Sequence, residues 1–325
     1  MQVSVIIVTR NEEIYILNCI KSIETQFEKD DEWELIIVDG MSEDKTKDIS
    51  SNYLSSVDYD YQILENEKKI LSAGWNIGIK NAKGKYVVRP DAHGALHAGY
   101  IKYGLEVLEQ KSDVTAVGGM LETKAKGFWG GVIKEALSSR VGVGNSSFRI
   151  ATQSGYYDTA VFALYRKDIF EKVGYFDEKL VRHQDNDMHR RVKEAGGKFY
   201  LDICMMADYY CRDTVPKLLK QMFSIGRYLP DVMSDGSLSV RHLAPFIFYM
   251  ILLILLIFGL INPMFILLNL WIFGGYLFII TLDTITRVIK KKNLSFLLNI
   301  FIIPVMHMSY AFGTLVGFIT KLKGD

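Results

Sequence analysis

Carboxylate, amide and imidazole side chains follow three short apolar runs in the first hundred residues. The three groups are Thr9-Arg10-Asn11-Glu12, Asp39-Gly40 and Asp91-Ala92-His93. Side chains of these types can bind a ligand, hold a cation or move a proton. Each group alone could be a helix cap or a turn. All three together favour a binding site, because an open α/β sheet binds ligands at the carboxyl ends of its strands.

The elements that would position these groups alternate between strand and helix patterns over residues 1 to about 215. The expected strands are residues 3–8, 34–39, 61–64 and 85–91. An amphipathic pattern with Ile16, Ile20 and Ile23 follows the first strand, and Ser42 or Asp44 can cap the helix after the second. Near-continuous apolar strands between helices predict an α/β domain with a mostly parallel sheet that is covered on both faces.

Several nucleotide-dependent and hydrolytic classes are disfavoured by motifs that the sequence lacks. No GxxxxGK[ST] is present, which argues against a P-loop kinase or ATPase. No GxGxxG follows a strand to open a helix, so dinucleotide binding is disfavoured. GxSxG is also missing, and an esterase-type nucleophile therefore has no support.

Composition places the apolar residues at one end of the chain. The 325 residues are 49% hydrophobic and 23% charged, with a formal net charge of +1. This length predicts one sizeable domain plus a further part. Residues 243–325 carry a net charge of +4, so the remainder is slightly negative and offers no basic footprint for nucleic acid. The three cysteines form no CxxC pair, which argues against a disulfide scaffold or a zinc module.

Four ordered motifs in the first 210 residues resemble glycosyltransferase family 2, the inverting enzymes with the GT-A nucleotide-sugar-binding fold. They are VSVIIVTRNEE, IIVDGMSEDKT, RPDAH and VGYFDEKLVRHQDNDMHRRV. Each motif is a modest signal, but their order and spacing together are specific. The DAH variant, the VGG at residues 117–119 and the apolar tail look most like bacterial succinoglycan-type exopolysaccharide glucosyltransferases.

The resemblance implies which residues meet a nucleotide-sugar donor. Asp39 stands in the place of the aspartate that contacts the nucleotide base. Thr9, Asn11 and Glu12 belong to the loop that joins the opening strand to the nucleotide. Lys69 stands where family members meet the nucleotide or its diphosphate. We therefore expect these five residues in the donor site.

RPDAH occupies the place of the family's DxD motif, so Asp91 and His93 are the implied ligands of Mn²⁺ or Mg²⁺. Asp91 is also expected to contact the donor. A divalent cation can neutralise the charge that develops on a departing nucleoside diphosphate. His93 replaces the usual final carboxylate, and Mn²⁺ accepts imidazole more readily than Mg²⁺ does. The alternative is that His93 is a surface histidine that does not touch the metal.

The implied catalytic base lies in RHQDNDMHRRV, where the family's ED motif aligns as Gln184-Asp185. The acceptor hydroxyl must lose a proton as it attacks the anomeric carbon, and Asp185 is predicted to accept it. Gln184 and Arg191 are predicted to contact the acceptor. Asp187, two residues further on, would point elsewhere on a helix. The alternative for Asp185 is a helix cap without a catalytic role.

Residues 243–282 contain no charged side chain and no histidine, and Asn262-Pro263 divides them into halves of about 20 residues. Two membrane-spanning helices joined by a tight turn are expected, with a buried hairpin in a soluble protein as the alternative. A third apolar stretch, residues 294–320, is predicted either to span or to lie along the interface. The lysines at 290–292 predict a cytoplasmic loop. We therefore expect a multi-pass cell-membrane protein whose catalytic domain is cytoplasmic.

Three parts are thus expected: a GT-A domain at residues 1–215, a connecting segment at 216–242 and a membrane region at 243–325. The connecting segment includes KLLKQMFSIGRYLPDVM, in which Lys217 and Lys220 can meet the headgroups of membrane lipids. Packing of this amphipathic piece against the catalytic domain is the alternative.

Together these features predict a membrane-associated inverting glycosyltransferase in exopolysaccharide or capsule assembly. It would move a hexose from a nucleotide-diphosphate sugar, expected to be a UDP-sugar, to a saccharide on a polyprenyl diphosphate. A processive synthase is the first alternative, but Gln221 and Arg227-Tyr228 do not match the QxxRW spacing of polymerising members. A membrane nucleotidyltransferase is disfavoured because its glycine-rich basic loop is absent. A non-catalytic binding protein is the third alternative, given the DAH and QD variants.

Overall fold

The computed structural model describes residues 2–144, 147–233 and 240–323. They form two compact units, and each unit is assembled from two stretches of chain. The first unit holds Met1–Glu122 and Ser147–Tyr210, and the second holds Thr123–Ser146 and Cys211–Asp325. Most of the expected GT-A domain therefore lies in the first unit, while residues 123–146 fold with the C-terminal part of the chain.

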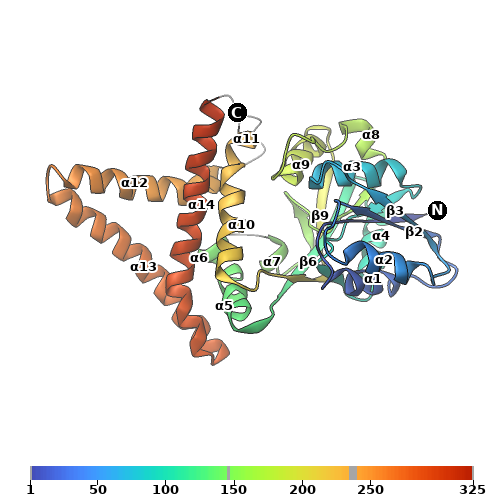
Figure 1. Cartoon of the computed structure of the whole chain (residues 1–325), viewed down its shortest axis with the longest axis horizontal. Helices are drawn as coiled ribbons and strands as arrows, with labels where there is room; N and C mark the ends of the chain where they lie inside the picture. Colours follow the sequence, from blue (N-terminus) through green and yellow to red (C-terminus); the bar gives the residue numbers. More distant parts are fainter. Residues whose placement is uncertain (1, 145–146, 234–239, 324–325) are drawn as a thin grey trace. The chain divides into compact units, whose positions relative to one another are not determined.

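Among the described residues, nine strands form one sheet in the order β3-β2-β1-β4-β8-β6-β9-β5, with β7 paired to β9 (Figure 1). The strands are β1 Val3–Thr9, β2 Trp33–Asp39, β3 Asp60–Glu65, β4 Tyr86–Val88, β5 Gly94–Leu96, β6 Val114–Lys124, β7 Gly155–Tyr157, β8 Leu164–Arg166 and β9 Lys198–Tyr210. Strands β1 to β4 are parallel to their neighbours within that group, which confirms the expected parallel sheet. Strand β8 runs antiparallel to β4 and β6, and β5 and β7 run antiparallel to β9.

Helices cover both faces of the sheet in the first unit (Figure 1). These helices are α1 Ile16–Glu24, α2 Thr46–Leu54, α3 Leu71–Asn81, α4 Tyr100–Gln110, α7 Ser147–Ile150, α8 Ile169–Val173 and α9 Gln184–Glu194. Helices α1, α2 and α4 bury apolar side chains against one face, and α3, α8 and α9 do so against the other. Strands β1 and β2 are buried almost throughout, as strands of a doubly covered parallel sheet should be.

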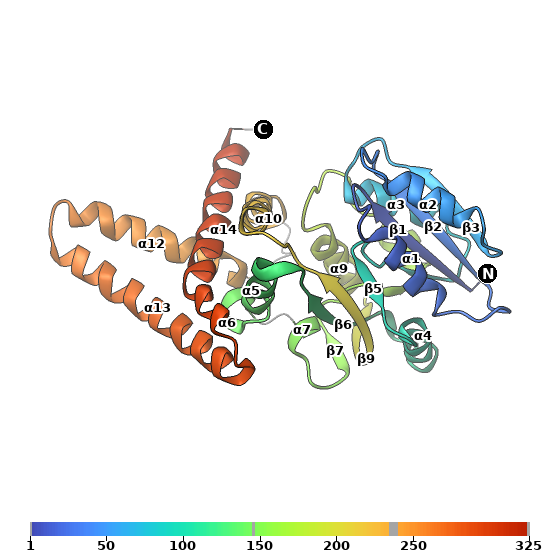
Figure 2. The same ribbon diagram turned by 60° about the horizontal axis from the view of Figure 1, so that its bottom comes forward.

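The second unit is helical in its described part, apart from the end of β6. Its elements are α5 Gly127–Leu137, α6 Arg140–Val143, α10 Val215–Arg227, α11 Leu229–Met233, η1 Val240–Leu243, α12 Ala244–Gly259, α13 Met264–Lys291, η2 Leu294–Leu298 and α14 Asn299–Leu322. Helices α12 and α13 form a hairpin that projects from one side of α14, in both Figure 1 and Figure 2. Large apolar side chains along this hairpin are exposed, including Leu260, Ile261 and Trp271.

Helix α10 packs closely along α14, because glycines let the two backbones approach. A Cβ atom added at Gly313 would lie 2.1 Å from the carbonyl oxygen of Phe223, and one added at Gly317 would lie 2.1 Å from that of Arg227. Small residues spaced by four allow this kind of close helix contact. The amphipathic piece of the connecting segment therefore lies against α14, an arrangement that the sequence did not predict.

Two helical stretches in the described part of the chain are long and apolar enough to cross a membrane, Met264–Lys291 and Leu294–Leu322. Only 6% of the apolar window of the first is buried, against 39% for the second, which α10 and its neighbours cover. Helix α12 has 16 residues and spans about 24 Å, less than the roughly 30 Å of a bilayer core. The expected pair of spans in residues 243–282 therefore stays a prediction.

The close contact between α10 and α14 makes a stability prediction. Replacing Gly313→Ala should lower the melting temperature of the detergent-solubilised protein by several degrees, since overpacking costs about 1–3 kcal/mol. Gly274→Ala is the matched control, because an added Cβ there meets nothing within 4 Å and alanine favours a helix. Equal melting temperatures for the two variants, measured by differential scanning fluorimetry, would contradict the packing.

Candidate active site

The carboxyl ends of β1 and β2 lie side by side because the two strands pair in parallel register. Thr9 is the partner of Asp39, and both side chains are buried. The Asp39 carboxylate accepts hydrogen bonds from the Ser42 amide at 2.8 Å and from the Ser42 hydroxyl at 2.6 Å. These bonds hold Asp39 at the predicted base-binding position, while its contact with a nucleotide stays a prediction.

The loops that follow β1 and β2 are fastened together by side chain–backbone hydrogen bonds. Asn11 has a left-handed backbone (φ 57°), and its side-chain oxygen accepts from the Glu43 amide at 2.8 Å. The amides of Asn11 and Glu12 donate to Ser42 Oγ at 3.0 Å and to Thr46 Oγ1 at 2.7 Å. Asn11 therefore has a structural role besides its predicted donor contact, and this fastening directs Glu12 toward the next strand end.

Glu12, Asp91 and His93 come together at the end of β4. Glu12 Oε1 lies 3.1 Å from His93 Nδ1, and His93 Nε2 lies 3.9 Å from Asp91 Oδ2. Burial raises the pKa of Asp91, and the nearby carboxylates of Asp185 and Glu12 add to the rise while His93 opposes it. A divalent cation would offset this accumulation of negative charge.

The donor atoms of Asp91 and His93 fit a cation. His93 Nε2 and Asp91 Oδ2 lie 3.9 Å apart, close enough that both side chains could contribute ligand atoms to one cation. A carboxylate oxygen with an imidazole nitrogen suits Mn²⁺ better than Mg²⁺. The two predicted ligands therefore lie where they could hold the metal, and their role as ligands stays a prediction.

A second group of metal-binding residue types lies on three neighbouring strands of the same unit. His97, Glu122 and Asp208 each offer one ligand atom, and these atoms lie within 4.8 Å of one another. His97 Nε2 is 2.7 Å from Asp208 Oδ1. Sequence reasoning did not propose this group, although His97 directly follows the short strand β5 and His93 directly precedes it.

Asp185 lies in the first turn of α9, with about half of its side chain exposed. Arg89, the first residue of the RPDAH motif, is buried. Its Nη2 lies 3.0 Å from Asp185 Oδ1. Desolvation would raise the pKa of Asp185, but the charge and the hydrogen bond of Arg89, together with the nearby His189, outweigh it and hold that pKa below its ordinary value. The carboxylate is therefore ionised at neutral pH, as a general base must be before it accepts a proton.

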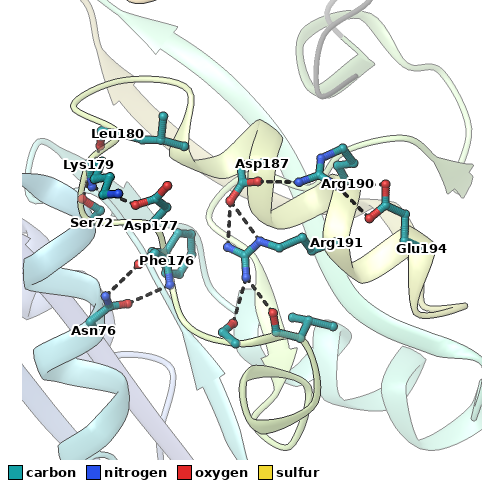
Figure 3. A network of polar contacts seen from close by, with 12 residues as sticks. Ser72, Asn76, Phe176, Asp177, Lys179, Leu180, Asp187, Arg190, Arg191 and Glu194 are labelled. Atoms are coloured by element: carbon teal, nitrogen blue, oxygen red, sulfur yellow. Dashed lines mark hydrogen bonds and ion pairs between the residues drawn. The ribbon is translucent and has the colours of Figure 1, made fainter. Parts of the chain in front are cut away.

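Asp187 has different partners from Asp185, as expected from their spacing, and is buried against two arginines of the same helix (Figure 3). It pairs with Arg190 at 3.0 Å and with Arg191 at 2.8 Å. Arg191 also donates to the carbonyl oxygens of Val173 at 2.8 Å and Gly174 at 3.1 Å, which close α8. Arg191 thus ties α9 to α8, and its predicted acceptor contact is in addition to this role.

The two other predicted side chains differ in exposure. Gln184 is buried, and its Oε1 has no hydrogen-bond partner among the described residues. Lys69 is exposed in the turn after β3, with a left-handed backbone (φ 58°). An exposed lysine beside the strand ends can reach a diphosphate, whereas a buried amide needs an acceptor group close to it. Both assignments stay predictions.

Sequence reasoning did not single out Arg89, Tyr165 or His189, which surround Asp185. Arg89 donates to Tyr165 Oη at 3.2 Å, and that hydroxyl lies 3.0 Å from His189 Nε2. The available signal was an arginine at the end of an otherwise apolar strand, and a histidine one helical turn after Asp185.

The comparisons with known proteins decide the family. Residues 4–174, more than half of the chain, match the profile described as "Glycosyl transferase family 2". The chain belongs to glycosyltransferase family 2. The motifs that suggested this family therefore carried a correct prediction, and the fold is the GT-A fold expected from them.

Two curated relatives cover much of the sequence. The dolichyl N-acetyl-alpha-D-glucosaminyl phosphate 3-beta-D-2,3-diacetamido-2,3-dideoxy-beta-D-glucuronosyltransferase of Methanococcus voltae is 28% identical over 98% of this chain and 97% of its own length. Succinoglycan biosynthesis protein ExoA of Rhizobium meliloti is 28% identical over 59% of this chain and 58% of its own length. The chain is thus similar to named glycosyltransferases, one of them along its whole length.

Solved structures confirm the fold. The mannosyltransferase PcManGT from Pyrobaculum calidifontis, in complex with GDP-Man and Mn²⁺, aligns with a TM-score of 0.64 over 98% of this chain and 88% of its own, at 14% identity. GalNAc-T7 with UDP, GalNAc and Mn²⁺ aligns with a TM-score of 0.53 over 71% of this chain and 48% of its own, at 15% identity. At these identities the likeness concerns the fold alone.

The burial of Cys19 beside Asp91 predicts how reactive its thiol is. Cys19 is fully buried with its Sγ 3.5 Å from the Asp91 carbonyl oxygen, and burial with the neighbouring carboxylates raises the pKa of this thiol strongly. Cys204 is exposed. Mass spectrometry after brief iodoacetamide treatment should find Cys204 modified and Cys19 unmodified until the protein is unfolded. Rapid modification of Cys19 in the folded protein would contradict this packing.

Proposed function

We propose that this chain is a membrane-associated inverting glycosyltransferase that adds one hexose from a UDP-sugar to a lipid-linked saccharide. The observation that carries the proposal is the position of an ionised Asp185 within the electrostatic reach of Asp91, which with His93 forms the proposed cation site. This arrangement puts a base and a diphosphate-binding group in one site, as a single displacement at an anomeric carbon requires.

In the proposed mechanism the acceptor hydroxyl attacks the anomeric carbon of an α-linked donor from the face opposite the diphosphate. Asp185 accepts the hydroxyl proton as the new β-glycosidic bond forms and the nucleoside diphosphate leaves. Asp39 and Thr9 bind the base end of the donor, and Glu12 lies beside His93 at the Asp91 end of the site. Lys69, which follows β3, is proposed to meet the nucleotide or its diphosphate. Mn²⁺ or Mg²⁺, when bound by Asp91 and His93, would neutralise the diphosphate.

The proposed acceptor is a saccharide carried on a polyprenyl phosphate or diphosphate. The name of the Methanococcus voltae relative specifies a dolichyl-linked sugar phosphate as acceptor and a β-linked product, and that relative matches this chain over 98% of its residues. The exposed apolar hairpin of α12 and α13 supports a membrane location, where such lipids reside. The lysines at 290–292 support the proposed cytoplasmic location of the catalytic unit.

We propose further that α14 lies along the membrane interface while the hairpin inserts. Helix α14 is packed along its length against α10, whose Lys217 and Lys220 are exposed or partly exposed cations that would be costly inside a bilayer. With no more than a hairpin inserted, a secretion channel for a long polymer has little support. Product length on a synthetic polyprenyl-phosphate saccharide tests this point: one added sugar supports the proposal, and a ladder of long chains favours a processive synthase.

The proposed reaction is tested most broadly with a panel of UDP- and GDP-sugars and a synthetic polyprenyl-phosphate acceptor in detergent. We expect metal-dependent release of UDP from one donor, with an acceptor product whose new bond is β by NMR. Retention of the α configuration, or pyrophosphate release from a triphosphate with a sugar phosphate, would contradict the proposal.

Asp185→Asn should abolish transfer while leaving donor binding intact, because it removes the base but keeps the size of the side chain. We expect kcat to fall by about 10²–10⁴-fold, with the Kd for UDP by calorimetry unchanged. Glu194→Gln, at the exposed end of the same helix, is the control and should retain kcat. Near-normal turnover of Asp185→Asn would remove Asp185 from the mechanism.

His93→Ala should raise the Mn²⁺ concentration needed for half-maximal activity at least tenfold, since outer contacts and ligands of a metal commonly contribute 10–100-fold. We expect His97→Ala to leave this concentration unchanged. The measurement is initial rate against Mn²⁺ after chelator treatment. A loss of metal activation in His97→Ala but not in His93→Ala would place the metal at the second group instead.

A further inference from the structure

We infer that Arg89 is a positioning residue for Asp185, which fixes the orientation and charge of that carboxylate without touching the substrates. The inference rests on the proposed function, in which Asp185 is the general base. It adds a residue that neither the sequence motifs nor the comparisons assign, and it follows from the packing around the Arg89 side chain.

Three aromatic rings enclose the Arg89 guanidinium. Its central carbon lies 4.7 Å from the ring centroid of Trp75, 5.1 Å from that of Tyr165 and 4.6 Å from that of Phe176. The rings come from α3, β8 and the segment after α8, and Arg89 itself is only 6% exposed. A cation held over ring faces from three elements has little freedom to rotate. The guanidinium is therefore a fixed donor.

A directed chain of hydrogen bonds runs from Arg89 away from Asp185. Arginine can only donate, so the Tyr165 oxygen accepts from Arg89 and the Tyr165 hydroxyl donates to His189 Nε2. His189 Nδ1 then carries its proton toward Thr159 Oγ1 at 3.1 Å. Burial lowers the pKa of His189 to about 4, so the ring is neutral and can accept in this way. The donors at Arg89 Nη2, Tyr165 and His189 thus each have an acceptor, while the buried Arg89 Nε has none among the described residues.

Asp185 receives the other hydrogen bond from Arg89 through Oδ1. The described residues give its side chain no further hydrogen-bond partner, so Oδ2 is open to an incoming hydroxyl. The titratable groups that face Asp185 are Arg89, His189, Tyr165 and Asp91. His189 is neutral, Tyr165 is uncharged and Asp91 is negative, which leaves Arg89 as the positive charge that keeps Asp185 ionised.

The test replaces Arg89→Gln in the full chain and measures kcat against pH with saturating Mn²⁺ and the donor identified by UDP release. Without the guanidinium, protonation of Asp185 should occur at higher pH. We therefore expect the acid limb of the kcat–pH profile to shift to higher pH by about one unit or more. The kcat at the optimum should fall by up to about a hundredfold, since the carboxylate is no longer held in place. The Kd for UDP and the Mn²⁺ requirement should stay within about twofold of wild type.

Arg166→Gln is the matched control, because Arg166 lies in the same unit and donates only to backbone carbonyls, among them that of Val114 at 2.9 Å. It should lower thermal stability without moving the acid limb. Arg89→Lys keeps the charge but not the planar fork, so we expect an unmoved acid limb with a kcat about tenfold lower.

An unmoved acid limb in Arg89→Gln would overturn the inference. A raised Mn²⁺ requirement would also overturn it, because it would mean that Arg89 supports Asp91 rather than Asp185. If Arg89→Gln does not fold, Arg89→Lys decides, and a wild-type kcat in that variant would overturn it. The two proposals fail separately. Loss of transfer in Asp185→Asn with unaltered Arg89 variants removes only the role of Arg89, whereas turnover by Asp185→Asn removes the proposed base as well.

Discussion

The candidate active site depends on how the repulsion between several carboxylates at one edge of the sheet is balanced. Glu12 and Asp185 both act electrostatically on Asp91, and burial alone already raises the pKa of Asp91. Such groups repel, and the repulsion grows as water is removed. The buried guanidinium of Arg89 balances Asp185 permanently, whereas His93 stands between Glu12 and Asp91. This division leaves one carboxylate fixed and ionised, as the proposed general base requires, and the other beside His93, where the proposed cation would bind.

Much of the first unit could be predicted from the sequence because its physical signals are local. Buried parallel strands read as continuous apolar runs, so β1 and β2 lie within a residue of their expected positions, and the partly exposed edge strand β3 does so as well. Parallel register then brings the residues at the strand ends to one edge, which is why Thr9 and Asp39 are neighbours. The spacing of Asp185 and Asp187 likewise predicted that they face different sides of α9.

The remaining features depend on contacts between segments far apart in the chain. The aromatic enclosure of Arg89 is built from residues 75, 165 and 176, and no sequence pattern links them. Residues 123–146 fold with the C-terminal helices, where Glu135 is buried in ion pairs with Arg287 and Lys291. The sequence of an amphipathic helix also does not specify which element it packs against. The packing of α10 on α14, which glycines of α14 permit, was therefore found only in the structure.

The central claim, that the end of β4 holds the donor's cation beside an ionised base, can be tested directly. Anomalous diffraction near the manganese edge from crystals grown with UDP and Mn²⁺ locates the ion without reference to activity. The account predicts a single strong peak bridging Asp91 and His93, with the Asp185 carboxylate still paired to Arg89 on the acceptor side. A peak at His97, Glu122 and Asp208 with nothing at Asp91 would contradict it.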